Sequence, residues 1–294
     1  MDTKFVQMLT IIYNKVYKSI NNYYIDIFLC GGMSTKDKIS LRDTLKERLR
    51  INKKIRVLYP EDLFIEFLNL NNEYDLLSLE QFLAENSDFI CIVCESPGSL
   101  VELGAFANNR KTLPKIIAMV EEKRKRQNSF IMLGPIKTIK KVDKGNVIYY
   151  SEKQPEELYK KLVSRIKQEY KNNLRYQNRN KPINSIVGLH YFIPIVLYLY
   201  GSVEVDLMVG GLRKLLNNLY GDDLKDYSRL YNSSMKLLYK QKIITQESRG
   251  ECKFYRLTNS GYDFATEMLN NLFILNRTKL IDGIRFDIMR NEYY

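Results

Sequence analysis

The sequence predicts an α/β protein with a Rossmann-like, doubly wound parallel sheet, followed by a winged helix-turn-helix domain. In the first half of the chain, short runs rich in β-branched and aromatic residues alternate with helical patterns, as a parallel sheet with crossover helices requires. From about residue 182, three helical patterns precede a strand, a glycine-containing turn, a second strand and another helix. This is the element order of a winged helix-turn-helix domain.

Five strands are expected from apolar runs at residues 24–30, 53–60, 88–94, 115–122 and 146–152. Between them we expect helices at residues 36–50, 61–70, 76–86 and 101–109, the first capped by Ser34 or Thr35. A charged helix begins at Pro155. The expected domains are a catalytic domain at residues 1–152, a connecting helix and linker at 153–181, and the winged-helix domain at 182–294.

Composition indicates a globular, soluble, cytoplasmic protein. The chain has 294 residues, enough for two domains of about 100–200 residues each, and 45% of its residues are hydrophobic. We find no signal-peptide pattern at the N-terminus. The longest apolar run, residues 191–200, is too short to cross a bilayer, which takes about 20 residues.

The positive charge is concentrated in the middle of the chain. Residues 110–180 contain 19 Lys or Arg and 7 Asp or Glu, a net charge of +12, which equals the net charge of the whole chain. Clustered cations of this kind are suited to the phosphates of a nucleic acid. A solvated, lysine-rich surface is the alternative explanation.

Cysteine and histidine limit the chemistry that the chain can perform. Cys91 and Cys94 lie three residues apart in a predicted strand, so their side chains point to opposite faces, and His190 is the only histidine. We therefore expect buried, reduced thiols and no metal site. Acid–base or nucleophilic chemistry would come from carboxylates, Tyr, Lys or Ser.

Three turns follow strands at one edge of the predicted sheet, where open parallel sheets bind ligands. Each turn also has an ordinary structural explanation, such as a glycine turn or a helix start. Their convergence nevertheless predicts a substrate site, and Glu102, in the first turns of the following helix, is its candidate reactive group. The expected substrate-binding residues are Gly31, Gly32, Tyr59, Glu61, Asp62, Glu95, Ser96, Gly98 and Ser99.

Four motifs in order give the sequence a family resemblance: "FLCGG", "YPEDLF", "LLSLEQFLAE" and "ESPGSLVELGAFANN". With the winged-helix pattern after them, they resemble the retron-encoded effectors of the nucleoside 2-deoxyribosyltransferase-like superfamily, over nearly the whole chain. The resemblance implies that Glu102 is a nucleophile. It implies that Glu80 is a supporting carboxylate, although family members more often have aspartate there, and that Glu95 binds sugar hydroxyls. A helix residue, a solvated residue and a turn residue are the respective alternatives.

The resemblance also implies a function in antiphage defence. The expected reaction is cleavage of the N-glycosidic bond of NAD or a related nucleotide, because the added C-terminal domain puts true base exchange in doubt. The implied partners are a reverse transcriptase and multicopy single-stranded DNA with its RNA, and homo-oligomers are expected. No cofactor is implied. The alternative is a non-catalytic, nucleotide-sensing DNA-binding subunit.

The expected nucleic-acid contacts lie on the third helix and the hairpin of the C-terminal domain. The polar residues expected to make these contacts are interleaved with four tyrosines, Tyr227, Tyr231, Tyr239 and Tyr255. A docking surface for a protein is the alternative, since this domain carries little net charge. The expected contact residues are Lys225, Arg229, Asn232, Lys236, Arg249, Lys253 and Arg256.

Overall fold

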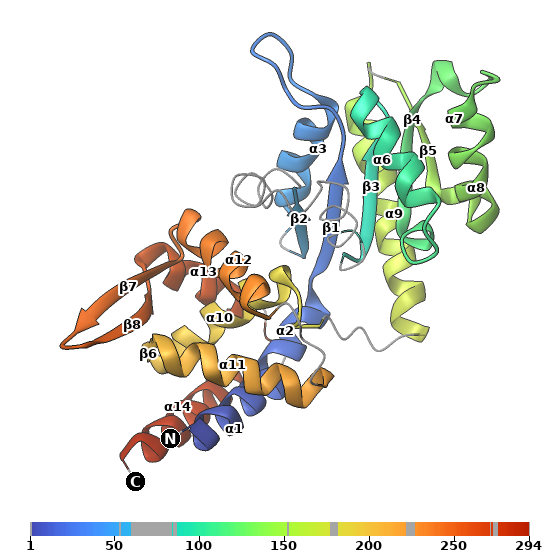
Figure 1. Cartoon of the computed structure of the whole chain (residues 1–294). Coiled ribbons are helices and arrows are strands. Elements are labelled where there is room, and N and C mark those ends of the chain that lie inside the picture. The colour runs from blue at the N-terminus through green and yellow to red at the C-terminus, as the bar shows by residue number, and fades with distance from the viewer. Residues whose placement is uncertain are drawn as a thin grey trace. The chain divides into compact units, whose positions relative to one another are not determined.

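A computed structural model describes residues 2–52, 54–59, 84, 87–151, 153–176, 182–221, 227–270, 272 and 276–293. The chain divides into two compact units (Figure 1). The parallel-sheet unit is continuous, Tyr24–Arg179, whereas the helical unit joins Met1–Tyr23 to Asn180–Tyr294. This division differs from the expected one at both ends of the first domain, for reasons that the packing of each unit explains.

The parallel-sheet unit contains all five expected strands, in the order β2-β1-β3-β4-β5. Every neighbouring pair is parallel. The strands are β1 (Ile25–Cys30), β2 (Ile55–Leu58), β3 (Phe89–Val93), β4 (Ile116–Glu121) and β5 (Val147–Tyr150). The predicted α/β class is therefore confirmed, and the arrangement is Rossmann-like.

Helices cover both faces of this sheet (Figure 1). On one face, α3 (Leu41–Arg50) and α9 (Pro155–Tyr176) bury leucines against alternate residues of the strands. On the other face, α6 (Pro97–Ala107) brings Phe106 to 6.0 Å from Phe28 of β1 between ring centres. The short α7 (Phe130–Leu133) and α8 (Pro135–Val142) follow β4, and α8 packs against α6.

Helix α9 belongs to the sheet unit, so the expectation of a separate connecting helix at residues 153–181 is wrong. Leu158, Leu162 and Ile166 recur at helical spacing and are buried in the same core as Ile148 and Tyr150 of β5. Most described charged residues of α9 are exposed, among them Lys160, Lys161 and Lys167, which is why the sequence suggested a solvated connector.

Helix α3 begins later than expected. Its N-cap is Ser40, whose Oγ accepts a hydrogen bond of 3.1 Å from the backbone N–H of Asp43. Ser34 instead uses its hydroxyl to contact the carboxylate of Asp43. Residues 31–40 consequently form a non-helical connection between β1 and α3.

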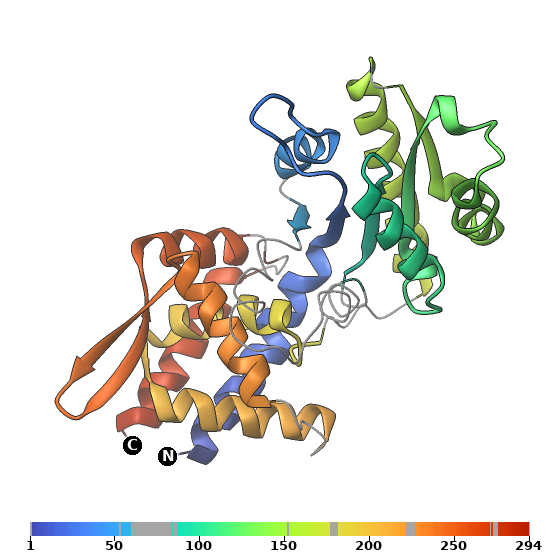
Figure 2. The same cartoon turned by 45° about the horizontal axis from the view of Figure 1, so that its top comes forward.

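The helical unit begins with residues that the sequence reading left unassigned: α1 (Asp2–Ile12), a π-helical turn (Tyr13–Tyr17) and α2 (Lys18–Tyr23). Helix α1 packs on α11 (Val205–Tyr220), where a Cβ on Gly211 would lie 2.4 Å from Cδ1 of Phe5. Helix α1 also contacts the C-terminal α14 (Arg277–Tyr293), so the two ends of the chain lie side by side (Figure 2). This packing separates Met1–Tyr23 from the sheet unit.

The remaining elements of the helical unit match the expected order. They are α10 (Ile186–Tyr200), β6 (Ser202–Glu204), α11, α12 (Tyr227–Lys240), β7 (Ile244–Arg249), β8 (Cys252–Leu257) and α13 (Asn259–Asn270). Strand β6 was not expected; it pairs antiparallel with β8 and gives the sheet order β6-β8-β7. Within the described ranges, no helix is both long and apolar enough to span a membrane.

The contacts in the turn from β8 into α13 explain why this turn has the sequence "LTNSG". The Oγ1 of Thr258 accepts a hydrogen bond of 3.0 Å from the N–H of Gly261, as an N-cap does. A Cβ on Gly261 would lie only 2.0 Å from the carbonyl oxygen of Ile243. The glycine is therefore required where α13 passes the start of β7.

Candidate active site

The candidate site lies where the connections after β1 and β3 meet near Tyr59, the described residue that follows β2, and we call this region the ligand edge. The connection after β3 is short, since Ser96 already caps α6. Ser96 and Ser99 form a reciprocal capping box, with backbone-to-side-chain distances of 3.1 and 3.2 Å. Both serines, predicted to bind substrate, thus stabilise the helix start, whereas Gly98 between them is exposed.

Glu102 is the sixth residue of α6 and lies in its second turn, because the helix begins at Pro97. This position agrees with the expected one in the first turns of the helix, but it lies beyond the first turn, where the helix dipole mainly acts. Its Oε2 atom is buried, while the residue as a whole is partly exposed.

The electrostatic interaction of Glu102 with Cys94, the residue after β3, indicates that Glu102 lies beside the end of this strand. Burial raises the pKa of the Cys94 thiol to about 12; the charge of Arg124 opposes this rise and that of Glu102 adds to it. Cys91 is buried as well, and burial also raises its pKa. Both cysteines are free, so the expected pair of core thiols is confirmed.

Glu95 holds the ligand edge together through backbone amides. Its Oε1 accepts from the N–H of Gly32 at 3.1 Å and from that of Arg42 at 3.2 Å, and its Oε2 accepts from Leu41 at 3.1 Å. The carboxylate therefore joins the turn after β1 to the start of α3. Sugar binding by Glu95 stays a prediction, and these bonds give Glu95 a structural role that the sequence did not reveal.

The two glycines after β1 make close approach possible, but to protein groups. A Cβ on Gly31 would lie 2.7 Å from Cβ of Arg42, and one on Gly32 would lie 3.3 Å from Cγ of Glu95. Any larger residue at Gly31 would push α3 away from the strand end. The glycine pair is thus required by the packing of the ligand edge itself.

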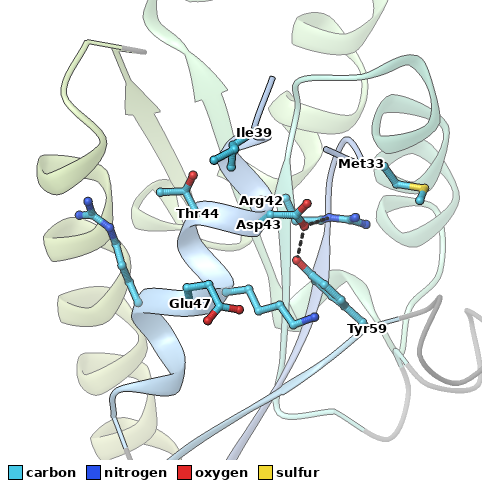
Figure 3. Close-up of a pocket in the computed structure, with 9 residues that line it drawn as sticks. Met33, Ile39, Arg42, Asp43, Thr44, Glu47 and Tyr59 are labelled. Carbon is cyan, nitrogen blue, oxygen red and sulfur yellow. Dashed lines mark hydrogen bonds and ion pairs between the residues drawn. The ribbon is translucent and has the colours of Figure 1, made fainter. Parts of the chain in front are cut away.

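Asp43 is the centre of a second cluster at this edge, which the sequence reading missed (Figure 3). Tyr59, which follows β2, donates a 2.6 Å hydrogen bond to Oδ1 of Asp43, and Arg42 approaches the same atom at 3.3 Å. Burial alone would raise the pKa of Asp43, but bonds from Ser34 and Tyr59 and the charge of Arg42 lower it to about 2. Asp43 is therefore ionised at neutral pH.

A cavity of about 630 Å³ opens beside this cluster, and Figure 3 shows the residues around it. The ring of Tyr59 has cations close to it, with the Arg42 guanidinium at 4.5 Å and the Lys46 ammonium at 3.5 Å from its centre. Nothing in the sequence pointed to Arg42. The only signal for Asp43 was its position three residues after Ser40. The cavity combines cations, the carboxylates of Asp43 and Glu47, and exposed apolar groups, Met33 and Ile39.

Several predicted residues lie outside the described part of the chain, namely Glu61, Asp62, Glu80 and Lys225, as do the expected helices at residues 61–70 and 76–86. The side chain of Arg229 is also not described. Over the described residues, no group of three or more His, Cys, Asp or Glu side chains is placed to bind a metal ion.

The predicted nucleic-acid contacts of the helical unit are only partly available. Asn232, Lys236 and Lys253 are exposed. Arg249 and Arg256 both pair with Glu247, the latter at 2.9 Å, so one carboxylate offsets two cations of the hairpin. These ion pairs reduce the positive potential that a phosphate would meet.

Most of the interleaved tyrosines belong to the core. Tyr227, Tyr231 and Tyr255 are buried, and only Tyr239 is exposed. Tyr227 donates a 2.6 Å hydrogen bond to the carbonyl of Val209. These aromatic rings anchor α12 rather than present a stacking surface.

The fold and the ligand edge together define an α/β protein with a Rossmann-like sheet, joined to a helical unit that carries a small antiparallel sheet. The chain belongs to the family described as STM3845 retron effector protein, which matches residues 38–246. Two relatives come from Escherichia coli, and their names propose each as a ribosyltransferase/DNA-binding protein. The retron Ec86 protein is 31% identical over 92% of this chain and 86% of its own length. The retron Ec73 protein is 24% identical over 88% and 86%.

Proposed function

We propose that this retron effector breaks the N-glycosidic bond of a nucleotide, NAD or a related molecule, with Glu102 as the nucleophile. The observation that carries the proposal is the position of Glu102 beside the end of β3, at the ligand edge of a parallel sheet. Ligands of such sheets bind at this edge. The names of the two relatives, which propose ribosyltransferase activity, support a reaction of this class.

In the proposed reaction, a carboxylate oxygen of Glu102 attacks C1′ of the sugar as the bond from C1′ to the base breaks. The base leaves with the bonding electron pair, and a glycosyl ester forms on Glu102. Nicotinamide leaves NAD as a neutral base, whereas the base of an uncharged nucleoside must also take up a proton. Water then attacks C1′ and gives up a proton, which releases the sugar and restores the carboxylate. Asp43 is not the acid that protonates the base, since its lowered pKa keeps it ionised.

The experiment compares Glu102→Gln with the wild type, each incubated with NAD and with deoxynucleosides, and measures free base by chromatography. Glu157→Gln is the matched control, because Glu157 is exposed on α9. We expect base release by the wild type and the control, and a loss of roughly a thousandfold or more in Glu102→Gln, as for removal of a nucleophile. Equal release by all three proteins would exclude Glu102 from this role.

We also propose that α10 to β8 form a winged helix-turn-helix, with α12 as recognition helix and the β7–β8 hairpin as wing. The order of three helices and a hairpin, with β6 completing the small sheet, supports this proposal. In a retron this domain would contact multicopy single-stranded DNA and reverse transcriptase. Co-purification of the two partners with wild type, and their loss from a Lys236→Glu, Lys253→Glu variant, would test it.

The alternative function, a nucleotide-sensing DNA-binding subunit without catalysis, is favoured by one observation. Glu95, Ser96 and Ser99 are engaged in hydrogen bonds within the protein, as in a rigid binding site. Binding of NAD with equal affinity by wild type and Glu102→Gln, without release of base by either, would establish this alternative. We further expect homo-oligomers, which size-exclusion chromatography with light scattering would detect.

A further inference from the structure

A second cavity, of about 650 Å³, lies at the outer edge of the parallel sheet, between β5 and α9. Strand β5 is the last in the sheet order, and among the described strands it pairs only with β4. We call this cavity the β5 groove. It lies at the opposite end of the strand order from β2, whose following residue Tyr59 belongs to the ligand edge.

The β5 groove is strongly basic. Four cations and a single carboxylate contribute to its lining: Lys125, Lys160, Lys161, Arg165 and Glu122. Lys125 and Lys160 are exposed. Lys161 is exposed too, and its pair with Glu157, at 2.8 Å, is a surface pair that contributes little. These three ammonium groups are available to an anionic partner.

Arg165 has a different role, because it fixes the shape of the groove. It is buried, contacts Asp143 at 2.6 Å and Glu169 at 3.1 Å, and donates two hydrogen bonds to Asn146. A Cβ on Gly145 would lie 2.8 Å from Nη1 of Arg165, so the glycine admits the guanidinium. The groove wall is therefore built by buried contacts.

Tyr149 of β5 positions cations at the groove. The ammonium groups of Lys125 and Lys140 each lie 5.1 Å from the centre of its ring, and Lys140 donates a 2.8 Å hydrogen bond to its hydroxyl. Tyr149 thus keeps Lys125, which follows β4, and Lys140 of α8 beside the cations of α9.

We propose that the β5 groove binds the phosphodiester backbone of single-stranded nucleic acid, without sequence preference. Charge complementarity selects this occupant: the groove lies within residues 110–180, which carry the net charge of +12. Positively charged grooves with aromatic side chains are typical of single-strand binding. This surface belongs to the parallel-sheet unit, is distinct from the winged-helix candidates, and does not depend on the glycosidic reaction.

The experiment measures binding of the full chain to a fluorescein-labelled oligothymidylate by fluorescence anisotropy, from about 50 to 200 mM salt. The groove variant carries Lys125→Gln and Lys160→Gln. Lys137→Gln with Lys141→Gln is the matched control, since both lysines are exposed on α8 and do not line the groove. Each variant is also made in a Lys236→Gln, Lys253→Gln background, which removes exposed cations of the winged-helix candidate.

We expect the groove variant to bind on the order of tenfold more weakly at 0.1 M salt, with a salt slope smaller by about 1.4, or 0.7 for each phosphate contact. The control variant should keep the wild-type slope, Lys125→Arg with Lys160→Arg should restore binding, and Glu102→Gln should bind as the wild type does. Equal losses in groove and control variants would overturn the proposal. So would no loss in either background, no binding by the wild type, or lysine-dependent binding of polyglutamate in place of oligothymidylate.

Discussion

Tyr59 donates a hydrogen bond of 2.6 Å to Oδ1 of Asp43, and this bond joins the residue after β2 to the first turn of α3. It connects two of the three segments that form the ligand edge. Because Asp43 also accepts from Ser34 on the connection after β1, its carboxylate organises two connections at once.

Asp43 should contribute stability that depends on pH. Its pKa is lowered to about 2 in the folded protein, so its contribution is present above the unfolded value, near 4, and is lost as pH falls towards 2. With 29% of the side chain exposed, solvent screening reduces the contribution to about 1 kcal/mol. Urea unfolding at pH 5 and pH 2.5 should show this loss in the wild type and not in Asp43→Asn. Asp37→Asn, at an exposed position in the preceding connection, should behave as the wild type does.

Tyr59→Phe should raise the pKa of Asp43, because the hydroxyl that stabilises the ionised carboxylate is removed. The free energy of unfolding at neutral pH should fall by about 1 kcal/mol. The chemical shift of the Asp43 carboxyl carbon, followed by NMR through the acid range, measures the pKa. An unchanged titration would show that the bond does not form in solution. Tyr239→Phe, at an exposed tyrosine, is the control.

Gly31→Ala should destabilise the parallel-sheet unit. The new Cβ would lie 2.7 Å from Cβ of Arg42, a backbone-proximal atom that cannot move aside cheaply. We expect a loss of about 1–3 kcal/mol, as for other overpacked positions. Gly98→Ala is the matched control, since a Cβ there meets no atom within 4 Å. Equal melting temperatures for the two variants would contradict the close approach of Gly31 to Arg42.

Adjacent glycines on α11 should respond to alanine in opposite directions. Gly211→Ala places a Cβ 2.4 Å from the ring of Phe5 and should loosen α1 from α11. Gly210→Ala meets nothing within 4 Å and should stabilise the helix by up to about 1 kcal/mol. Hydrogen exchange of the α1 amides would report the first effect, and the melting temperature would report the second. If the α1 amides exchanged faster in Gly210→Ala and not in Gly211→Ala, Gly210 rather than Gly211 would be the glycine that contacts α1.

Much of the parallel-sheet unit was predictable because its strands are buried on both faces. The run "FICIV" of β3 is apolar at every position, and every one of those residues is buried. The ligand edge was harder to predict. Ser34 and Ser40 have the same capping chemistry, but Ser40 caps α3 whereas the hydroxyl of Ser34 contacts the carboxylate of Asp43. Local sequence does not contain that information.

The helical unit shows a second limit of sequence reasoning. Tyr231 and Tyr239 lie eight residues apart on α12, yet one is buried and the other exposed. Their residue type is the same, so only packing against other elements separates them. Helix α1 packs against α11, about 200 residues later in the chain. Local sequence patterns therefore could not show that residues 1–23 belong to the helical unit.

Glu247→Gln should increase the affinity of the chain for nucleic acid, provided that the β7–β8 hairpin is a wing. The substitution releases Arg249 and Arg256 from their shared carboxylate. We expect a gain of several-fold and a steeper salt dependence, since two cations become available to phosphates. Glu251→Gln, in the exposed turn of the same hairpin, changes the charge equally and is the control. Equal gains from both would indicate a general effect of charge.

The division of the chain also sets an order of events during its synthesis. Residues 1–23 leave the ribosome before their packing partners on α10, α11 and α14, which follow only after residue 180. The parallel-sheet unit is continuous and can complete its fold during translation, as domains generally do. The apolar faces of α1 and the π-helical turn must wait for the last segment of the chain. A nascent-chain truncation that ends before α10 should therefore expose these first helices to chaperones and proteases.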